Sequence, residues 1–427
     1  MLTVLSSFAS VMQNIWYVIL AFVVLMIMVT IHEFGHYSAG KLLKFKINEF
    51  AVGMGPKIFS KTKKNGEVFS LRLLPLGGFC AFEGEDEEND APGAFNKQAP
   101  WKRLIVLFSG AFFNFVSALL VCAILFSCYG ETVAKVGVVF EYADAPMQML
   151  EADDIIYEIN GKKVYLIDSL NRYMTDETLT IKVIKKDGSE QTVTVKKGTF
   201  TNAYTQTAQN TIVLGTTADG VLTLGQGTMI YKMDGKLLSK PGDFEKYFSE
   251  ISGDDCVVEV YATDGNFYTV TLNKETLSKL NVEESTYSGM GISPRYDRYK
   301  FGFWRSAGRI VPYCLETGLV ILRSLGGIFT GDTPLSTLGG PVTTISTVSS
   351  VMSYGFASVL LLIVLISVNL AVFNLLPVPA LDGCRMVFVL IEWICGKPVN
   401  RKVEAWVNGI GLVLLIAFMI LVDLLKL

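Results

Sequence analysis

The only two histidines of the 427-residue chain, His32 and His36, flank Glu33 in the sequence H-E-F-G-H. Residues four positions apart lie on the same face of a helix, so the two imidazoles can bind one metal ion. A glutamate beside the first imidazole can act as a general base. The spacing H-E-x-x-H is typical of zinc hydrolases, although it also occurs on helices that bind no metal.

The position of this motif favours the functional interpretation. No Lys, Arg, Asp or Glu occurs in residues 1–31, so the motif lies at the end of an uncharged apolar segment. An ionisable group inside a membrane helix costs about 2.5 kcal/mol or more unless it has a partner. We therefore predict that His32, Glu33 and His36 are retained for chemistry.

The composition indicates a membrane protein that also carries a water-soluble part. Hydrophobic residues make up 51% of the chain and charged residues 18%, and the mean hydropathy is +0.41. The net charge of −3 gives no sign of a nucleic-acid partner. The seven cysteines show no C-x-x-C spacing, which argues against a disulfide framework or a cysteine metal site.

Four apolar segments are long enough to cross a bilayer, so we predict a polytopic α-helical membrane protein. Residues 1–31 lack the basic region and cleavage site of a signal peptide and are predicted to be an anchor. Residues 38–103 contain eleven Lys or Arg, against none in the first 37, which places this loop in the cytoplasm and the N-terminus outside. A second basic loop near residue 400 places the C-terminus outside as well. The predicted spans are about 14–37, 104–129, 351–376 and 405–422.

Within the first domain, 1–129, the loop 45–83 has strand-like pieces interrupted by glycines, among them Gly53 and Gly55. It is more apolar than a cytoplasmic loop needs to be. Non-helical backbone enters a membrane only where protein or a water-filled cavity satisfies its polar groups. We predict a re-entrant, membrane-associated β-hairpin or sheet whose edge pairs with an extended substrate, with both glycines in the substrate-binding region. A surface hairpin is the alternative.

Residues 130–300 contain an internal repeat with β-type alternation. The segment 154–162, D-I-I-Y-E-I-N-G-K, aligns with 228–236, T-M-I-Y-K-M-D-G-K. Each unit reads as a strand, a tight turn, a helix-like stretch and a hairpin. We predict two α+β domains, 130–205 and 206–300, inserted outside the cytoplasm. The following segment, 301–345, is apolar but interrupted by charges and a proline, which favours an amphipathic stretch on the outer membrane surface.

The last domain, 346–427, supplies the second half of the predicted site. Its third span ends N-L-L-P-V-P-A-L-D-G, where Pro377 and Pro379 prevent a regular helix and open the backbone into a sheltered cavity. A catalytic zinc takes three protein ligands and keeps one position open, so Asp382 is the predicted third ligand of one Zn²⁺ per chain. Asn374 is a candidate for holding the substrate backbone or the developing oxyanion. An ordinary Asp-Gly turn at the membrane surface is the alternative.

Together, H-E-F-G-H, G-M-G-P, P-L-G-G and N-L-L-P-V-P-A-L-D-G resemble the bacterial site-2 proteases of the regulator of sigma-E protease type. The segment A-D-D-I-I-Y-E-I-N-G-K-K-V resembles the core of a PDZ domain. The resemblance implies an intramembrane zinc metalloendopeptidase with tandem PDZ-like domains, in which His32, His36 and Asp382 bind zinc and Glu33 is the catalytic base. Pro377 and Pro379 are then expected beside the substrate.

The same resemblance implies a multi-pass protein of the bacterial inner membrane with its active site near the cytoplasmic side. Its substrates would be transmembrane proteins, either anti-sigma factors already trimmed by an upstream site-1-type protease or remnant signal peptides. The PDZ-like region would act as a filter against uncut substrates or only as a steric cover, and membrane lipid is an expected partner.

Two other functions fit parts of the sequence. A prenyl-protein-type membrane protease also carries H-E-x-x-H, but it needs a glutamate ligand on a later helix, and no intramembrane glutamate follows Glu33. A membrane-anchored PDZ adaptor or chaperone that has lost its metal is the second possibility. The intact Glu33 argues against it.

Overall fold

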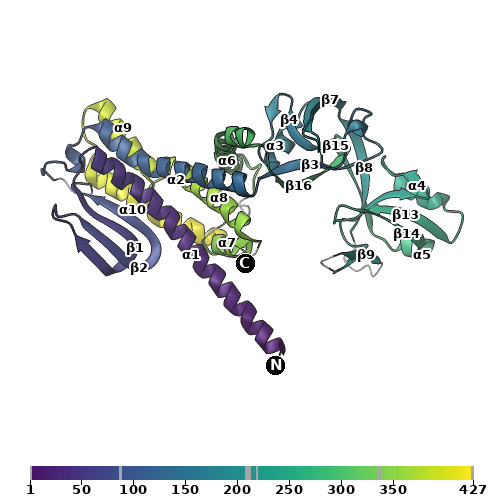
Figure 1. The fold of residues 1–427 in the computed structure, drawn as a ribbon, viewed down its shortest axis with the longest axis horizontal. Coiled ribbons are helices and arrows are strands. Elements are labelled where there is room, and N and C mark those ends of the chain that lie inside the picture. Colours follow the sequence, from purple (N-terminus) through teal and green to yellow (C-terminus); the bar gives the residue numbers. More distant parts are fainter. Residues whose placement is uncertain are drawn as a thin grey trace. The chain divides into compact units, whose positions relative to one another are not determined.

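The structure is a computed structural model of the full chain (Figure 1). It describes residues 2–85, 89–206, 213–217, 220–334, 339, 341–352 and 354–424. The predicted ranges 1–129, 206–300, 301–345 and 346–427 each include a few residues outside this set.

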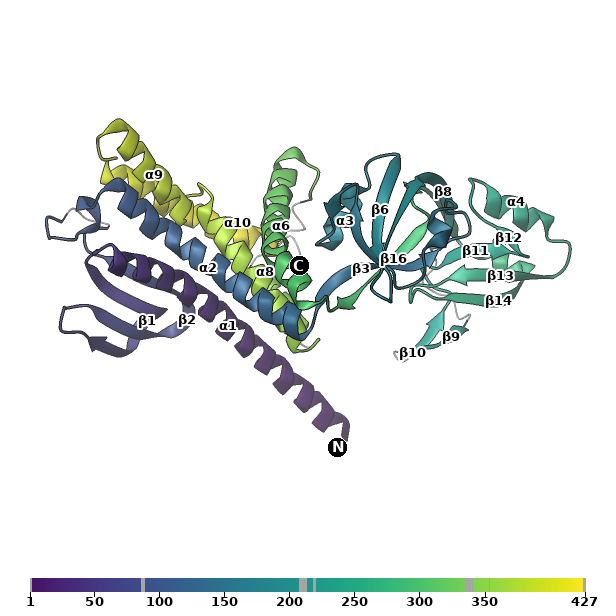
Figure 2. The same cartoon turned by 45° about the horizontal axis from the view of Figure 1, so that its top comes forward.

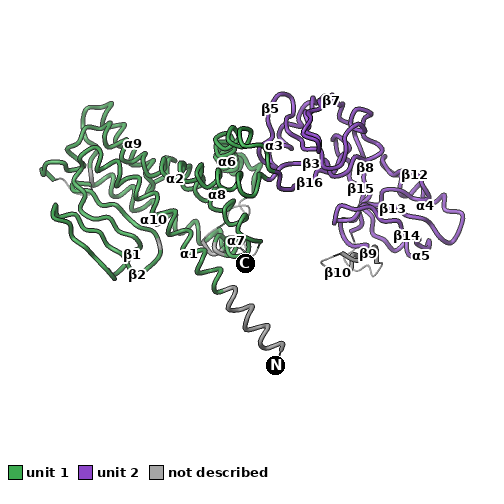
Figure 3. The backbone as a smooth tube through the Cα atoms, in the orientation of Figure 1, with its two compact units in different colours: residues 1–131, 300–427 green, residues 132–299 purple. Residues whose placement is uncertain are grey.

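The chain forms two compact units, which are coloured separately in Figure 3. Unit 1 comprises Met1–Glu131 and Lys300–Leu427, and unit 2 comprises Thr132–Tyr299. The helical membrane part therefore comes from both ends of the chain, and the β-rich part is an insertion between them.

Unit 1 contains the apolar helices. Among the described residues, four helices are long and apolar enough to cross a membrane, which confirms the predicted number. α1 extends beyond the predicted end at residue 37, so the H-E-F-G-H motif lies within a continuous helix and not at its end. The helices that contain these spans are α1 (Leu2–Leu42), α2 (Pro100–Cys128), α8 (Phe356–Leu375) and α10 (Arg401–Leu424).

Helix α2 is the centre of this bundle. It packs against α1 and α8 and also against α6 (Phe303–Thr330) and α9 (Asp382–Cys395), as Figure 2 shows for α1 and α8. Its buried side chains include the small residues Gly110, Ala111 and Ala118. Small residues let helix backbones approach closely in a membrane, where helices associate through packing and polar contacts.

The loop after α1 forms a hairpin of two long strands, β1 (Ile47–Thr62) and β2 (Val68–Phe82). Ala51 of β1 pairs with Phe79 and also with Ser70, so the first half of β1 lies between two parts of β2. The hairpin is thus folded into a small sheet whose last segment, residues 78–82, pairs with β1 along one side and, among the described residues, with no strand along the other. A β-structure was predicted for this loop.

Polar contacts attach this hairpin to the end of α1. Lys63 Nζ lies 3.0 Å from Tyr37 Oη and 2.9 Å from Glu67 Oε1. Lys41 donates to the other carboxylate oxygen of Glu67, which is only 2% exposed. A buried carboxylate needs such partners, so these contacts hold the hairpin beside the helix that carries the histidines.

Unit 2 contains two six-stranded sheets. The first has the order β16-β3-β4-β6-β7, with β5 beside β4, and the second has the order β14-β13-β11-β8-β15, with β12 beside β11. Helices α3 (Ile167–Tyr173) and α4 (Asp243–Glu250) accompany them, and each sheet has its own core of buried apolar side chains. The strands of the first sheet are β3 (Glu131–Val139), β4 (Ile155–Ile159), β5 (Lys162–Lys163), β6 (Thr178–Ile184), β7 (Glu190–Lys196) and β16 (Ile292–Tyr299). Those of the second are β8 (Gly198–Thr205), β11 (Met229–Met233), β12 (Lys236–Leu237), β13 (Asp255–Tyr261), β14 (Phe267–Asn273) and β15 (Val282–Gly289).

The two sheets are interleaved in the sequence. The second sheet begins with β8 at Gly198, and the last strand, β16, returns to the first sheet beside β3. The strands therefore divide differently from the consecutive ranges 130–205 and 206–300, because pairing of distant strands leaves no local signal in the sequence. The repeated segments do form equivalent strands, since β4 and β11 lie inside their sheets with the same burial pattern.

Helix α6 follows the insertion and is not among the four candidate spans of the described chain. It contains Pro312 and four charged residues, of which Arg309 is only 2% exposed. Its guanidinium donates two hydrogen bonds of 2.6 Å to the carboxylate of Glu131, which is equally buried. This bidentate pair joins α6 to the residue that follows α2 and begins β3.

We expect Arg309→Leu to destabilise unit 1 by about 3–5 kcal/mol, because it leaves the Glu131 carboxylate buried without a partner. The double variant Glu131→Leu/Arg309→Leu removes both charges and should recover most of this loss. Thermal unfolding of the purified proteins in one detergent measures the difference. Equal losses in the single and double variants would contradict the interpretation.

Candidate metal centre

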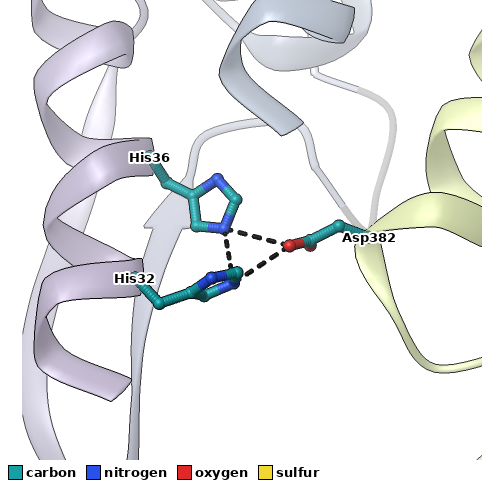
Figure 4. Close-up of side chains that lie close together, drawn as sticks. All are labelled: His32, His36 and Asp382. Atoms are coloured by element: carbon teal, nitrogen blue, oxygen red, sulfur yellow. Dashed lines mark hydrogen bonds and ion pairs between the residues drawn. The ribbon is translucent and has the colours of Figure 1, made fainter. Parts of the chain in front are cut away.

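The structure brings His32, His36 and Asp382 together in unit 1 (Figure 4). His32 Nε2 lies 3.1 Å from His36 Nε2, and Asp382 Oδ2 lies 3.0 Å and 3.2 Å from these two nitrogens. The histidines lie on adjacent turns of α1, whereas the aspartate is the first residue of α9. Three potential ligand atoms thus converge from segments about 350 positions apart in the sequence.

These distances fit a tetrahedral zinc ion. Nitrogen and oxygen ligands lie about 2.0–2.2 Å from zinc, so neighbouring ligands of a tetrahedral site are about 3.3–3.5 Å apart. The three observed distances between ligand atoms, 3.0–3.2 Å, are only slightly shorter than this. Each histidine is 7% exposed and the aspartate side chain 18%, so the group is sheltered while one side remains open.

The hydrogen bonding of His36 also fits a cation. Its Nδ1 lies 2.8 Å from the carbonyl oxygen of Val106 on α2, and only an Nδ1–H can donate there. In the neutral imidazole, Nε2 then carries a lone pair directed at Asp382 Oδ2. The same oxygen lies 3.0 Å from His32 Nε2. Lone pairs that face one another at this distance repel unless a cation lies between them.

The charge beside Asp382 decides the ionisation of this residue. Burial acts to raise the pKa of this carboxyl group, but positively charged imidazoles at His36 and His32 outweigh burial and hold the pKa below its usual range. A metal cation in this place would act in the same direction, and an ionised carboxylate is the form that binds a metal.

Glu33 lies next to this group on the wall of a cavity of about 470 Å³. Its carboxylate accepts a hydrogen bond from the backbone N–H of Cys80, in the last segment of β2. The hairpin thereby orients the predicted general base. The cavity is also lined by His36, Asp382, the β2 residues Phe79–Phe82, Glu85, Phe95, Val106, Leu107, Ala380, Arg385 and Asn408.

The chain that leads to Asp382 is a strained loop between α8 and α9. Ala380 has φ +73°, which a residue with a Cβ adopts only at a cost of about 1–3 kcal/mol. Its N–H lies 3.2 Å from Asn408 Oδ1 of α10, which holds the loop in this form. A Cβ on Gly383 would lie 2.2 Å from the carbonyl oxygen of Leu376, so only glycine lets the start of α9 approach the end of α8 this closely.

The predicted substrate-binding residues lie outside the metal group. Asn374 is near the end of α8, and Pro377 and Pro379 are in the loop before α9. Gly53 and Gly55 have φ +85° and +83° where β1 bends. Among the described residues, the lining of the cavity at Glu33 includes none of these five. Their contact with substrate stays a prediction.

Three residues of α2 that line the back of the metal group have no role in the sequence analysis. Val106, Gly110 and Asn114 are spaced four apart, so they lie on one face of the helix. Val106 acts through its backbone and Gly110 through the absence of a side chain, and neither property is visible as a motif. Only Asn114 has a sequence signal, as an amide within an apolar span.

A model described as peptidase family M50 matches residues 20–418. The chain belongs to peptidase family M50. It is 29% identical to CPE1693 of Clostridium perfringens and 26% identical to FN1322 of Fusobacterium nucleatum, both named as predicted zinc metalloproteases. It is 24% identical to the regulator of sigma-E protease RseP of Salmonella typhimurium. These matches cover 95–96% of this chain and 96–98% of the relatives.

The M50 membership confirms the resemblance that the motifs indicated, and it makes this chain a metalloprotease with several membrane spans. It does not assign the individual ligands. The M50 match spans both halves of the metal group as well as the β-rich insertion.

Gly110 provides a test of the metal site. A Cβ at this position would lie 2.4 Å from His36 Nε2 and 2.6 Å from His32 Cε1. We expect Gly110→Ala to displace the imidazoles and weaken zinc binding by about tenfold or more. Zinc content after dialysis against a chelator measures this.

The matched control is Gly409→Ala in α10, where an added Cβ meets no atom within 4 Å. It should keep the zinc content of the parent. Full zinc occupancy in a folded Gly110→Ala protein would show that α2 does not confine the site.

Proposed function

We propose that this M50 metalloprotease hydrolyses peptide bonds within transmembrane segments of other membrane proteins. His32, His36 and Asp382 hold one zinc ion, and Glu33 is the general base. The observation that carries the proposal is the convergence of three ligand atoms within 3.2 Å of one another between apolar helices. A soluble peptide has no reason to enter such surroundings, whereas a membrane segment does.

A bound zinc ion would polarise the scissile carbonyl and promote ionisation of a water molecule. The remaining chemistry belongs to Glu33. Its carboxylate takes the proton from the attacking water and later delivers it to the amine of the leaving peptide. The Cys80 N–H keeps this carboxylate in the cavity beside His36 and Asp382.

The substrate must be extended when it is cut. Backbone groups within a helix are already paired, so a protease gains access to a peptide bond only after the helix opens. The cavity wall formed by Phe79–Phe82 belongs to a strand segment that pairs with β1 on one side and, within the described chain, with no strand on the other, which suits it to pair with an extended peptide. Gly53, Gly55, Asn374, Pro377 and Pro379 are proposed to contact the peptide around this position.

The similarity to a relative named regulator of sigma-E protease supports a role in regulated proteolysis. We propose substrates of the anti-sigma factor or remnant signal-peptide type, the former first trimmed by a site-1-type protease. The basic loop after α1 supports an orientation in which the hairpin and the active site lie near the cytoplasm. Both termini and unit 2 are then extracytoplasmic, and membrane lipid surrounds the spans.

Unit 2 is proposed to be a pair of PDZ-like domains that selects substrates. A cavity of about 1000 Å³ lies between strands of its two sheets, with aromatic and polar side chains that include Tyr204, Tyr261 and Asn202. This space is large enough for a short chain end but not for a folded domain. A substrate with an intact outer domain is therefore excluded.

The proposed mechanism requires Glu33 for proton transfer but not for zinc binding. We expect Glu33→Gln to lower cleavage of a co-expressed single-span substrate by about 10²–10⁴-fold while zinc content stays near one ion per chain. Substrate fragments on immunoblots and metal analysis of the purified protein provide the two measurements. Equal cleavage by variant and parent would refute the mechanism.

Asp382→Asn tests the third ligand separately. An amide is a weaker zinc ligand than a carboxylate, so this variant should lose both zinc and activity. Retention of zinc and activity would remove Asp382 from the ligand set without affecting the role of Glu33.

The filter is tested by a variant in which a short Gly-Ser linker replaces residues 132–299. The two ends of this insertion lie on neighbouring strands, β3 and β16, so a short linker can join them. The parent should cleave a substrate with a trimmed outer domain in preference to the untrimmed form, and the variant should cleave both at similar rates. Unchanged preference would refute the filter. The same deletion with Glu33→Gln controls for other proteases.

A further inference from the structure

The metal group has two histidines, and the ring nitrogen that each directs away from Asp382 meets helix α2. His36 Nδ1 donates to the backbone carbonyl of Val106. His32 Nδ1 lies 3.4 Å from the side-chain amide of Asn114, which is completely buried. The second contact is the more informative, because an amide can either donate or accept.

The ring atom that His32 must present to the ligand group decides which role fits. With Nδ2 facing His32, the imidazole would accept at Nδ1 and therefore carry its proton on Nε2, the atom that faces His36 and Asp382. The other amide atom is buried and has no hydrogen-bond partner among the described residues, so it holds the side chain in neither orientation. A half-turn of the amide exchanges the two atoms. Oδ1 then accepts from His32 Nδ1–H, and the Nε2 lone pair faces the ligand group.

We propose that Asn114 is a positioning residue of the zinc site, whose Oδ1 accepts a hydrogen bond from His32 Nδ1–H. This bond fixes the tautomer in which Nε2 is free to bind metal and sets the angle of the ring. The inference rests on the proposed zinc site and adds a function for an intramembrane amide outside the H-E-F-G-H and L-D-G motifs.

The arrangement of α2 supports this assignment. Val106, Gly110 and Asn114 form one stripe at four-residue intervals, opposite two histidines that are also four residues apart. The stripe offers an acceptor to His36, leaves space at Gly110, and offers an acceptor to His32. Both histidines then donate through Nδ1 and present Nε2, so a single rule describes the whole site.

A purely structural role for Asn114 is the alternative. Amides also join membrane helices through hydrogen bonds, and such a contact would contribute to packing of α1 on α2 without influencing the metal. The two roles differ in what an aspartate does at this position. A carboxylate can only accept when ionised, so Asp preserves an acceptor role.

The experiment compares Asn114→Leu, Asn114→Met and Asn114→Asp in the full-length protein in detergent. Zinc is removed with a chelator and titrated back against a chromophoric competitor to obtain Kd, and thermal unfolding of the zinc-free protein reports folding. Cobalt(II) spectra of the loaded proteins report ligand geometry independently of activity. Cys122→Ala, a fully buried change two turns along α2, is the matched control.

We expect Asn114→Leu and Asn114→Met to bind zinc about 10–100-fold more weakly than the parent, as is typical when an outer-sphere partner is removed. Asn114→Asp and Cys122→Ala should stay within a few-fold of the parent. If Leu fails to fold, the flexible Met side chain provides the same comparison. Parent-like affinity in the Leu and Met variants, or a loss in Asp as large as in Leu, would overturn the proposal.

The test also separates this inference from the proposed function. If the parent itself binds no zinc, the proposed metal site fails. If the parent binds zinc and all Asn114 variants bind it equally well, the site stands and only the role of Asn114 is refuted.

Discussion

A buried imidazole has two ring nitrogens, and in an apolar environment both need partners. This constraint governs the centre of unit 1. His32 and His36 direct one nitrogen each at Asp382 and the other at α2. The contact between α1 and α2 is therefore part of the site. If α1 were shifted along α2, buried ring nitrogens would lose their partners. The position of the site along α1 and the packing of α1 on α2 are therefore linked.

The same constraint explains the irregular chain before Asp382. If Asp382 were within a continuous membrane helix, the helix would fix the direction of its side chain. The carboxylate would then have to span the distance between that helix and α1. Here α8 ends, the chain passes through the strained Ala380, and α9 begins with Asp382 itself. The amide of Asn408 and the absent side chain of Gly383 make this loop feasible. The cost of the strain is offset by contacts that come from α8 and α10.

The sequence predicts this protein unevenly, and the reason is physical. Apolar length and H-E-x-x-H spacing are local properties, so the four spans and the paired histidines follow from them, and the proline-rich L-D-G segment suggested Asp382. The pairing of β16 with β3 and the double pairing of Ala51 depend on distant segments and leave no local pattern. The carbonyl of Val106 leaves no sequence signal for a different reason, because every residue carries the same backbone group.

The last segment of β2 raises the question of how an open strand edge persists next to apolar helices. Unpaired backbone N–H groups are costly there and would attract wrong partners. Two carboxylates reduce this cost, since Cys80 N–H donates to Glu33 and Phe82 N–H lies 3.1 Å from Glu85 Oε2. The strand edge and the general base thus satisfy each other. One hydrogen bond, from Cys80 N–H to the Glu33 carboxylate, links the strand edge to the general base. A shift of the hairpin would therefore move the edge relative to the cavity and Glu33 relative to the metal group.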